Sequence, residues 1–75
     1  MFEKSKDKRR HEQAVKKALS ELNGIQNDLD QAYTRFNLTT DPSLQDAYIY
    51  EISALRAKHT YLLRQMKALE KEERP

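Results

Sequence analysis

The sequence predicts an all-α protein, an antiparallel two-helix hairpin of the coiled-coil type that we expect to dimerise into a four-helix bundle. The chain of 75 residues has one glycine and two prolines, and 35% of its residues are charged. Few helix breakers and many good helix formers favour helix over strand. Two long segments also carry apolar residues at alternating steps of three and four, with one short interruption between them.

The first periodic segment predicts a helix over about residues 10–37. Its apolar stripe holds the a/d spacing of a helix that packs on another helix for three heptads. The stripe consists of Val15, Ala18, Leu22, Ile25, Leu29, Ala32 and Phe36, and Leu19 and Tyr33 widen it. Residues 1–10 have no apolar periodicity, and we expect them to form a flexible basic tail ahead of a hairpin domain at residues 11–75.

Asn23-Gly24 interrupts this segment with a dipeptide that often forms turns. Glycine inside a helix costs about 1 kcal/mol. The stripe nevertheless keeps its phase from Leu22 through Ile25 to Leu29, whereas a turn would reset it. We therefore expect one continuous helix, with a break near Gly24 as the alternative.

The second periodic segment predicts a helix over about residues 42–71. Its stripe consists of Tyr48, Ile52, Leu55, His59, Leu62, Met66 and Leu69, with Ile49 and Leu63 on its flank. We expect Asn37 to end the first helix in a left-handed conformation, Asp41 to cap the second helix, and Pro42 to occupy its first position. A loop this short makes the two helices antiparallel neighbours.

Folding the chain at this loop brings the two stripes together along their length. Leu29 then lies near Ile52, and Val15 lies near Met66. The predicted core within the hairpin consists of Val15, Leu22, Ile25, Leu29, Phe36, Tyr48, Ile52, Leu55, His59, Leu62 and Met66.

The segment TDPSLQDAYIYEISALRAKHTYLLRQMKA resembles the YaaL-like proteins, a family of small Firmicute proteins classed as a domain of unknown function. The resemblance covers about residues 22–68 and departs from the family pattern at His59 and Thr60. It implies a helical hairpin and no established activity. The matching residues are Thr40, Asp41, Pro42, Leu44, Asp46, Ile49, Tyr50, Glu51, Ala54, Tyr61, Leu62 and Leu63.

No residue pattern in the chain points to catalysis, a metal or a cofactor, so we expect a protein that is not an enzyme. The chain has no cysteine nucleophile and no phosphate-binding or zinc-binding motif. His59 lies in the stripe, where a hydrogen-bonded structural role is expected. Small sporulation phosphatases are also helical hairpins, but their Ser-Gln-Glu-Leu-Asp motif is replaced here by Tyr50 to Ala54, Tyr-Glu-Ile-Ser-Ala. The carboxylates near the loop lack EF-hand spacing.

Charge is distributed unevenly along the chain. Residues 1–17 carry seven basic and three acidic groups, a net of +4; residues 18–57 carry two and six, a net of −4; residues 58–75 carry five and three, a net of +2. The open end of the hairpin is therefore basic and the loop end acidic. An anion-binding tail formed by Lys4, Lys6, Lys8, Arg9 and Arg10 makes nucleic-acid binding the alternative function.

A second stripe lies on a different face of the second helix, at Tyr50, Ala54, Ala57 and Tyr61. Small residues between tyrosines let another helix approach closely. A chain of this size buries too little surface for more than marginal stability, and association would add to it. We therefore expect this stripe to bind a second copy, giving a homodimer, or a helix of another protein.

The absence of cysteine fits a reducing compartment. No apolar run approaches the ~20 residues that span a bilayer, and no secretory signal precedes the helices. The sequence therefore predicts a cytoplasmic protein without an integral membrane segment. Its expected function is a non-enzymatic protein–protein interaction or adaptor module without a cofactor.

Overall fold

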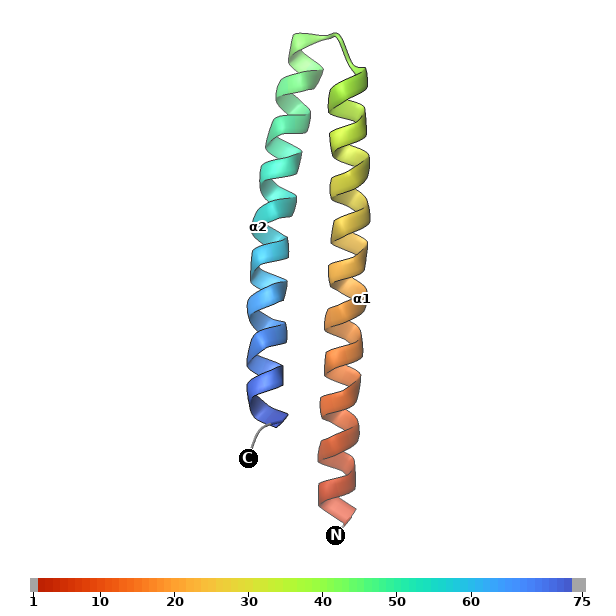
Figure 1. Ribbon diagram of the computed structural model, residues 1–75, viewed down its shortest axis with the longest axis vertical. Helices are drawn as coiled ribbons and strands as arrows, with labels where there is room; N and C mark the ends of the chain where they lie inside the picture. The colour runs from red at the N-terminus through yellow and green to blue at the C-terminus, as the bar shows by residue number, and fades with distance from the viewer. Residues whose placement is uncertain (1, 74–75) are drawn as a thin grey trace.

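The protein is a hairpin of two helices, α1 (Phe2–Leu38) and α2 (Pro42–Glu73), joined by three residues. The structure is a computed structural model that describes the backbone of residues 2–73 and the side chains of residues 8–71. The helices run antiparallel and side by side, so the two ends of the chain lie at the end away from the loop (Figure 1). The hairpin is 61 Å long and 15 by 13 Å across. The predicted all-α hairpin is confirmed.

Helix α1 begins at Phe2, whereas the sequence analysis expected a tail over residues 1–10 and a helix from about residue 10. The missing apolar stripe was the reason for that expectation. Lysine, arginine and glutamate are strong helix formers, and neither glycine nor proline precedes Gly24 in the chain, so helical propensity alone continues the helix towards the N-terminus. The other helix ends lie within two residues of the predicted positions, the usual uncertainty of a helix boundary.

The core is a single seam between the helices. Its centre is a cluster of Ile25, Leu29, Ala32 and Ile52, with Phe36, Leu55 and Leu62 packed against it. Ala32 has no exposed surface, and Ala18 is also buried. The structure leaves Val15, Leu22, Tyr48, His59 and Met66 half-buried. Two helices shield each other on one side only, so most of the expected core stays partly in contact with solvent.

Gly24 lies inside a continuous α1, and its φ is not positive. A Cβ built on Gly24 meets no atom within 4 Å outside the local helix backbone. We therefore expect Gly24→Ala to raise the free energy of unfolding by about 1 kcal/mol, because alanine has the higher helix propensity and restricts the unfolded chain. Denaturant titration at one fixed protein concentration measures the change. Ala54→Gly, at an exposed position of α2, should lower stability by a similar amount; a destabilised Gly24→Ala variant would contradict this account.

Asp41 caps α2 through its side chain. Its Oδ1 accepts hydrogen bonds from the backbone N–H groups of Ser43 (2.8 Å) and Leu44 (3.1 Å), and its carbonyl accepts one from Gln45 N–H (2.9 Å). These are the free amides that an N-cap residue satisfies, and Pro42 follows at the first helical position, where no amide is needed.

The expected left-handed end at Asn37 is wrong. Asn37 lies within α1, which ends at Leu38, and no non-glycine residue in the described part of the chain has a positive φ. The loop is held by Thr39 instead. Its hydroxyl accepts a hydrogen bond from the Asp41 N–H (3.4 Å), and its carbonyl accepts one from Gln45 Nε2 (3.0 Å). These side-chain bonds turn the chain without left-handed backbone.

Removing the cap should destabilise the hairpin. We expect Asp41→Ala to lower the free energy of unfolding by about 1 kcal/mol, whereas Asp41→Asn keeps most of the effect because asparagine caps equally well. Thermal unfolding followed by circular dichroism measures both variants. Glu51→Ala removes an exposed carboxylate of the same helix and serves as control. Equal losses of stability from Asp41→Ala and Glu51→Ala would show that the negative charge, and not the cap, stabilises the helix.

Candidate interaction surfaces

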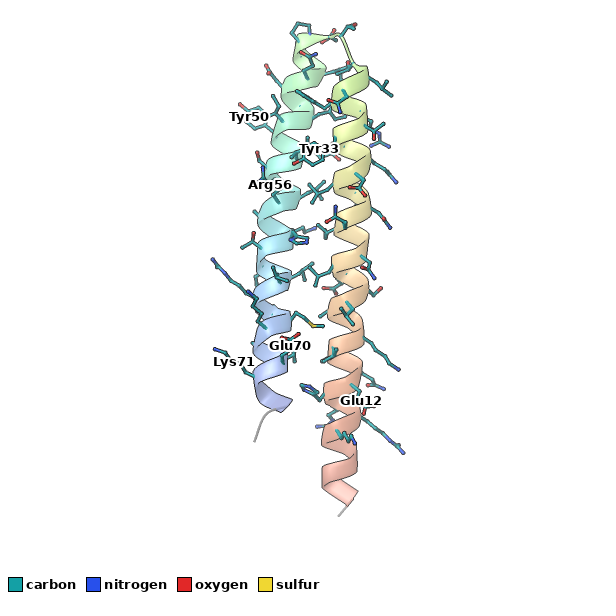
Figure 2. The ribbon with its side chains drawn as sticks, in the orientation of Figure 1. Glu12, Tyr33, Tyr50, Arg56, Glu70 and Lys71 are labelled. Carbon is teal, nitrogen blue, oxygen red and sulfur yellow. The ribbon has the colours of Figure 1, made fainter. Side chains whose placement is uncertain are left out.

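The outer face of α2 carries the tyrosine face, which we define as Tyr50, Ala54, Ala57 and Tyr61. Steps of four, three and four place these residues in one row along the helix. All four are exposed, Tyr50 by 77% and Tyr61 by 60%. Figure 2 shows Tyr50 projecting away from α1. The expected second stripe is therefore a continuous open surface within the hairpin.

Tyr61 also borders a groove between the helices. This groove is lined by Glu21, Gly24, Ile25, Asp28, Lys58, Tyr61 and Leu62. A second hollow shares Glu21, Tyr61 and Leu62 with it and continues along Ala14, Lys17, Ala18, Gln65 and Leu69 towards the open end. Because Gly24 has no side chain, the wall of the groove is low beside Tyr61. The tyrosine face thus continues into a trough along one side of the hairpin.

Another groove lies between the helices on the opposite side of the hairpin. On each helix some of its lining residues are offset by two positions from residues of the first groove, and residues two apart on a helix point in nearly opposite directions. This opposite groove is lined by Gln26, Leu29, Tyr33, Arg56, His59 and Thr60. Gln26 Nε2 donates to Asp30 Oδ1 at 3.1 Å, beside the groove along α1. His59 is half-buried here, at the edge of the core. Its neighbours in the groove supply hydroxyl, amide and guanidinium groups and no second histidine.

Four exposed apolar side chains accompany this groove: Leu19 (46%), Tyr33 (42%), Ile49 (46%) and Leu63 (40%). The sequence analysis treated them as the margin of the core stripe and missed that they form a surface. The signal was present as two rows at heptad spacing, Leu19–Gln26–Tyr33 and Ile49–Arg56–Leu63. We call these six residues the lateral face. Figure 2 shows Tyr33 pointing towards α2.

The acidic residues near the loop do not converge on one point. Asp28, Asp30, Asp41, Asp46 and Glu51 are all exposed. Among the residues whose side chains are described, no three or more histidines, aspartates or glutamates are grouped closely enough to hold a metal ion. His11 lies on α1 nearer the open end of the hairpin, several helical turns from the part of α1 that faces His59.

The side chains of the basic end are described only from Lys8 onwards. Lys8, Arg9 and Arg10 are exposed on α1, and the side chains of Lys4 and Lys6 lie outside the described residues. Neither helix of the described region combines the length and the apolar character that crossing a bilayer requires.

These features define a small all-α helical hairpin with exposed apolar side chains along both helices. The chain belongs to the family described as "Protein of unknown function (DUF2508)", whose family model matches residues 1–70. No curated protein and no solved structure is significantly similar to it. Membership of a family without an assigned function agrees with the resemblance described above, and the narrower YaaL-like assignment stays a prediction.

Proposed function

We propose that the protein is a cytoplasmic, non-enzymatic adaptor module that binds a helix of a partner protein on the tyrosine face. The supporting observation is that Tyr50 and Tyr61 expose 77% and 60% of their surface and that Tyr50 projects away from α1 (Figure 2). Neither ring belongs to the packed cluster between the helices. Exposed tyrosines spaced by small residues suit a surface that binds another helix.

Each tyrosine offers about 150–250 Å² of surface for burial. Tyrosine is enriched among the residues that dominate binding energy, and its hydroxyl keeps a polar tip at the rim of an interface. Ala54 and Ala57 lie between the rings, so a partner helix would come close to the α2 backbone there. The exposed charges of Glu51 and Lys58 border the face and would form a mixed polar rim.

Photo-crosslinking in cells tests this proposal. A photoreactive phenylalanine derivative in place of Tyr50 should give a discrete adduct with another protein, and Tyr61→Glu in the same chain should abolish that adduct. The control places the same group at Gln31, an exposed position of α1. If position 50 gives no adduct, or gives the same adducts as position 31, the tyrosine face is not the binding surface.

The runner-up function is accessory nucleic-acid binding by the basic end. It is favoured by the net charge of +4 on residues 1–17 and by the exposure of Lys8, Arg9 and Arg10. Such binding should weaken steeply with salt, because each neutralised phosphate releases counterions. Fluorescence anisotropy with labelled DNA or RNA measures it. If deleting residues 1–10 leaves the affinity unchanged, the basic end does not carry this function.

A further inference from the structure

The lateral face has a mirrored pattern along the hairpin. On α1 the polar residue Gln26 lies seven residues after Leu19 and seven before Tyr33. On α2 Arg56 lies seven residues after Ile49 and seven before Leu63. Residues seven apart lie on the same side of a helix. Each helix therefore presents an apolar patch, a polar centre and a second apolar patch.

The two rows lie level with each other. Leu29 and Ile52 belong to one packed cluster, and Gln26 lines the same groove as Arg56, so the two pairs lie at similar heights along the hairpin. Leu19 precedes Leu29 by ten residues, and Leu63 follows Ile52 by eleven. Because the helices are antiparallel, both steps lead towards the open end, so Leu19 and Leu63 lie at about the same height along the hairpin. Gln26 and Arg56 line the same groove at the centre of the face.

This arrangement is complementary to itself when a second hairpin is turned end over end. A twofold axis through the groove between Gln26 and Arg56, across the hairpin, places α1 against α1 and α2 against α2 in opposite directions. Leu19 of one copy then meets Tyr33 of the other, and Ile49 meets Leu63. A self-complementary patch of this kind is what an isologous dimer interface requires.

Charge supports the same orientation. The loop half of one copy, residues 27–55, carries five acidic groups and one basic group, a net of −4. It would lie along residues 14–25 and 57–70 of the other copy, which carry five basic and two acidic groups, a net of +3. Asp46 and Arg64 lie at the same edge of α2, nearly equidistant from Arg56. End-over-end pairing brings each Asp46 to the Arg64 of the other copy. The two Arg56 side chains approach each other at the axis, where the exposed Asp30 carboxylate beside Gln26 contributes opposite charge.

We propose that a second copy of this chain covers the lateral face in antiparallel orientation and completes a four-helix bundle. The four apolar side chains, each 40–46% exposed in the single hairpin, become the second layer of the core. The tyrosine face lies elsewhere on α2 and stays open for a partner. The dimer and the adaptor function therefore use different surfaces, and either proposal can fail without the other.

Engineered cysteines test the orientation, because the chain has none of its own. Gln26→Cys lies next to its own copy across the axis and should form a disulfide-linked dimer under mild oxidation. Leu19→Cys lies about 21 Å from its own copy, fourteen residues at 1.5 Å each, so it should cross-link about tenfold more slowly. Mixed with tagged Tyr33→Cys chains, Leu19→Cys should give the tagged heterodimer.

Ala54→Cys, on the tyrosine face, is the matched control. The proposal would be overturned if Ala54→Cys or Leu19→Cys formed its homodimer as fast as Gln26→Cys does, or if no variant gave a cross-linked species. A charge reversal adds a second readout for variants that fold, as judged by circular dichroism. Arg64→Asp should weaken dimerisation about tenfold, and Asp46→Arg in the same chain should restore it. Failure of this restoration would also contradict the antiparallel pairing.

Discussion

We expect Leu29→Ala to lower the free energy of unfolding by about 2–5 kcal/mol, the range for truncating a buried leucine. Leu29 is 6% exposed and lies in the central cluster with Ile25, Ala32 and Ile52. Small domains are stable by only about 5–15 kcal/mol, and this one has a single seam of core. The variant should therefore be largely unfolded at temperatures where the wild type is folded.

Leu38→Ala is the matched control, because it makes the same change in the same helix at a residue that is 77% exposed. Its effect should stay within about 0.5 kcal/mol. Both are measured by denaturant titration at one protein concentration, since association would contribute to apparent stability. Equal effects of the two substitutions would mean that the central cluster does not hold the hairpin together.

The second large effect is expected from Ala32→Leu. Ala32 has no exposed surface and lies where the two helices pack. Added methylene groups at such a position force neighbouring side chains out of their rotamers or push the helices apart, which costs about 1–3 kcal/mol. Thermal unfolding should show a lower midpoint, even though leucine is a good helix former.

Ala54→Leu separates packing from propensity. It places the same side chain on the exposed outer face of α2, where its effect on stability should stay within about 0.5 kcal/mol. A more stable Ala32→Leu variant would show that the seam has room beside Ala32 and that the helices are not closely packed there.

The two helices and their pairing could be predicted because the apolar spacing is a strong signal. The phase continuity from Leu22 to Leu29 correctly predicted that Gly24 would not break α1. Asp41 and Pro42 marked the start of α2 since capping depends on local chemistry alone. The start of α1 was missed because apolar periodicity reports packing, whereas residues 3–10 are helical through propensity.

The details of the loop and of the surfaces were harder to predict. The hydrogen bond from Gln45 to the Thr39 carbonyl joins residues six apart and follows no standard capping offset, so no local rule would find it. The exposure of Leu19 and Leu63 depends on how far each helix shields the other. From the sequence alone, the apolar residues at the buried centre of a stripe cannot be distinguished from those at its solvent-exposed margin.

Sedimentation velocity over a range of concentrations tests most directly how the hairpin uses its open surfaces. We predict that the wild type sediments as a dimer, with twice the 8.9 kDa mass of one chain. Tyr50→Glu should remain a dimer, whereas Leu63→Glu should sediment as a folded monomer. A wild-type monomer at all concentrations, or a dimer that Tyr50→Glu splits and Leu63→Glu leaves intact, would contradict the assignment of the lateral face to a second copy.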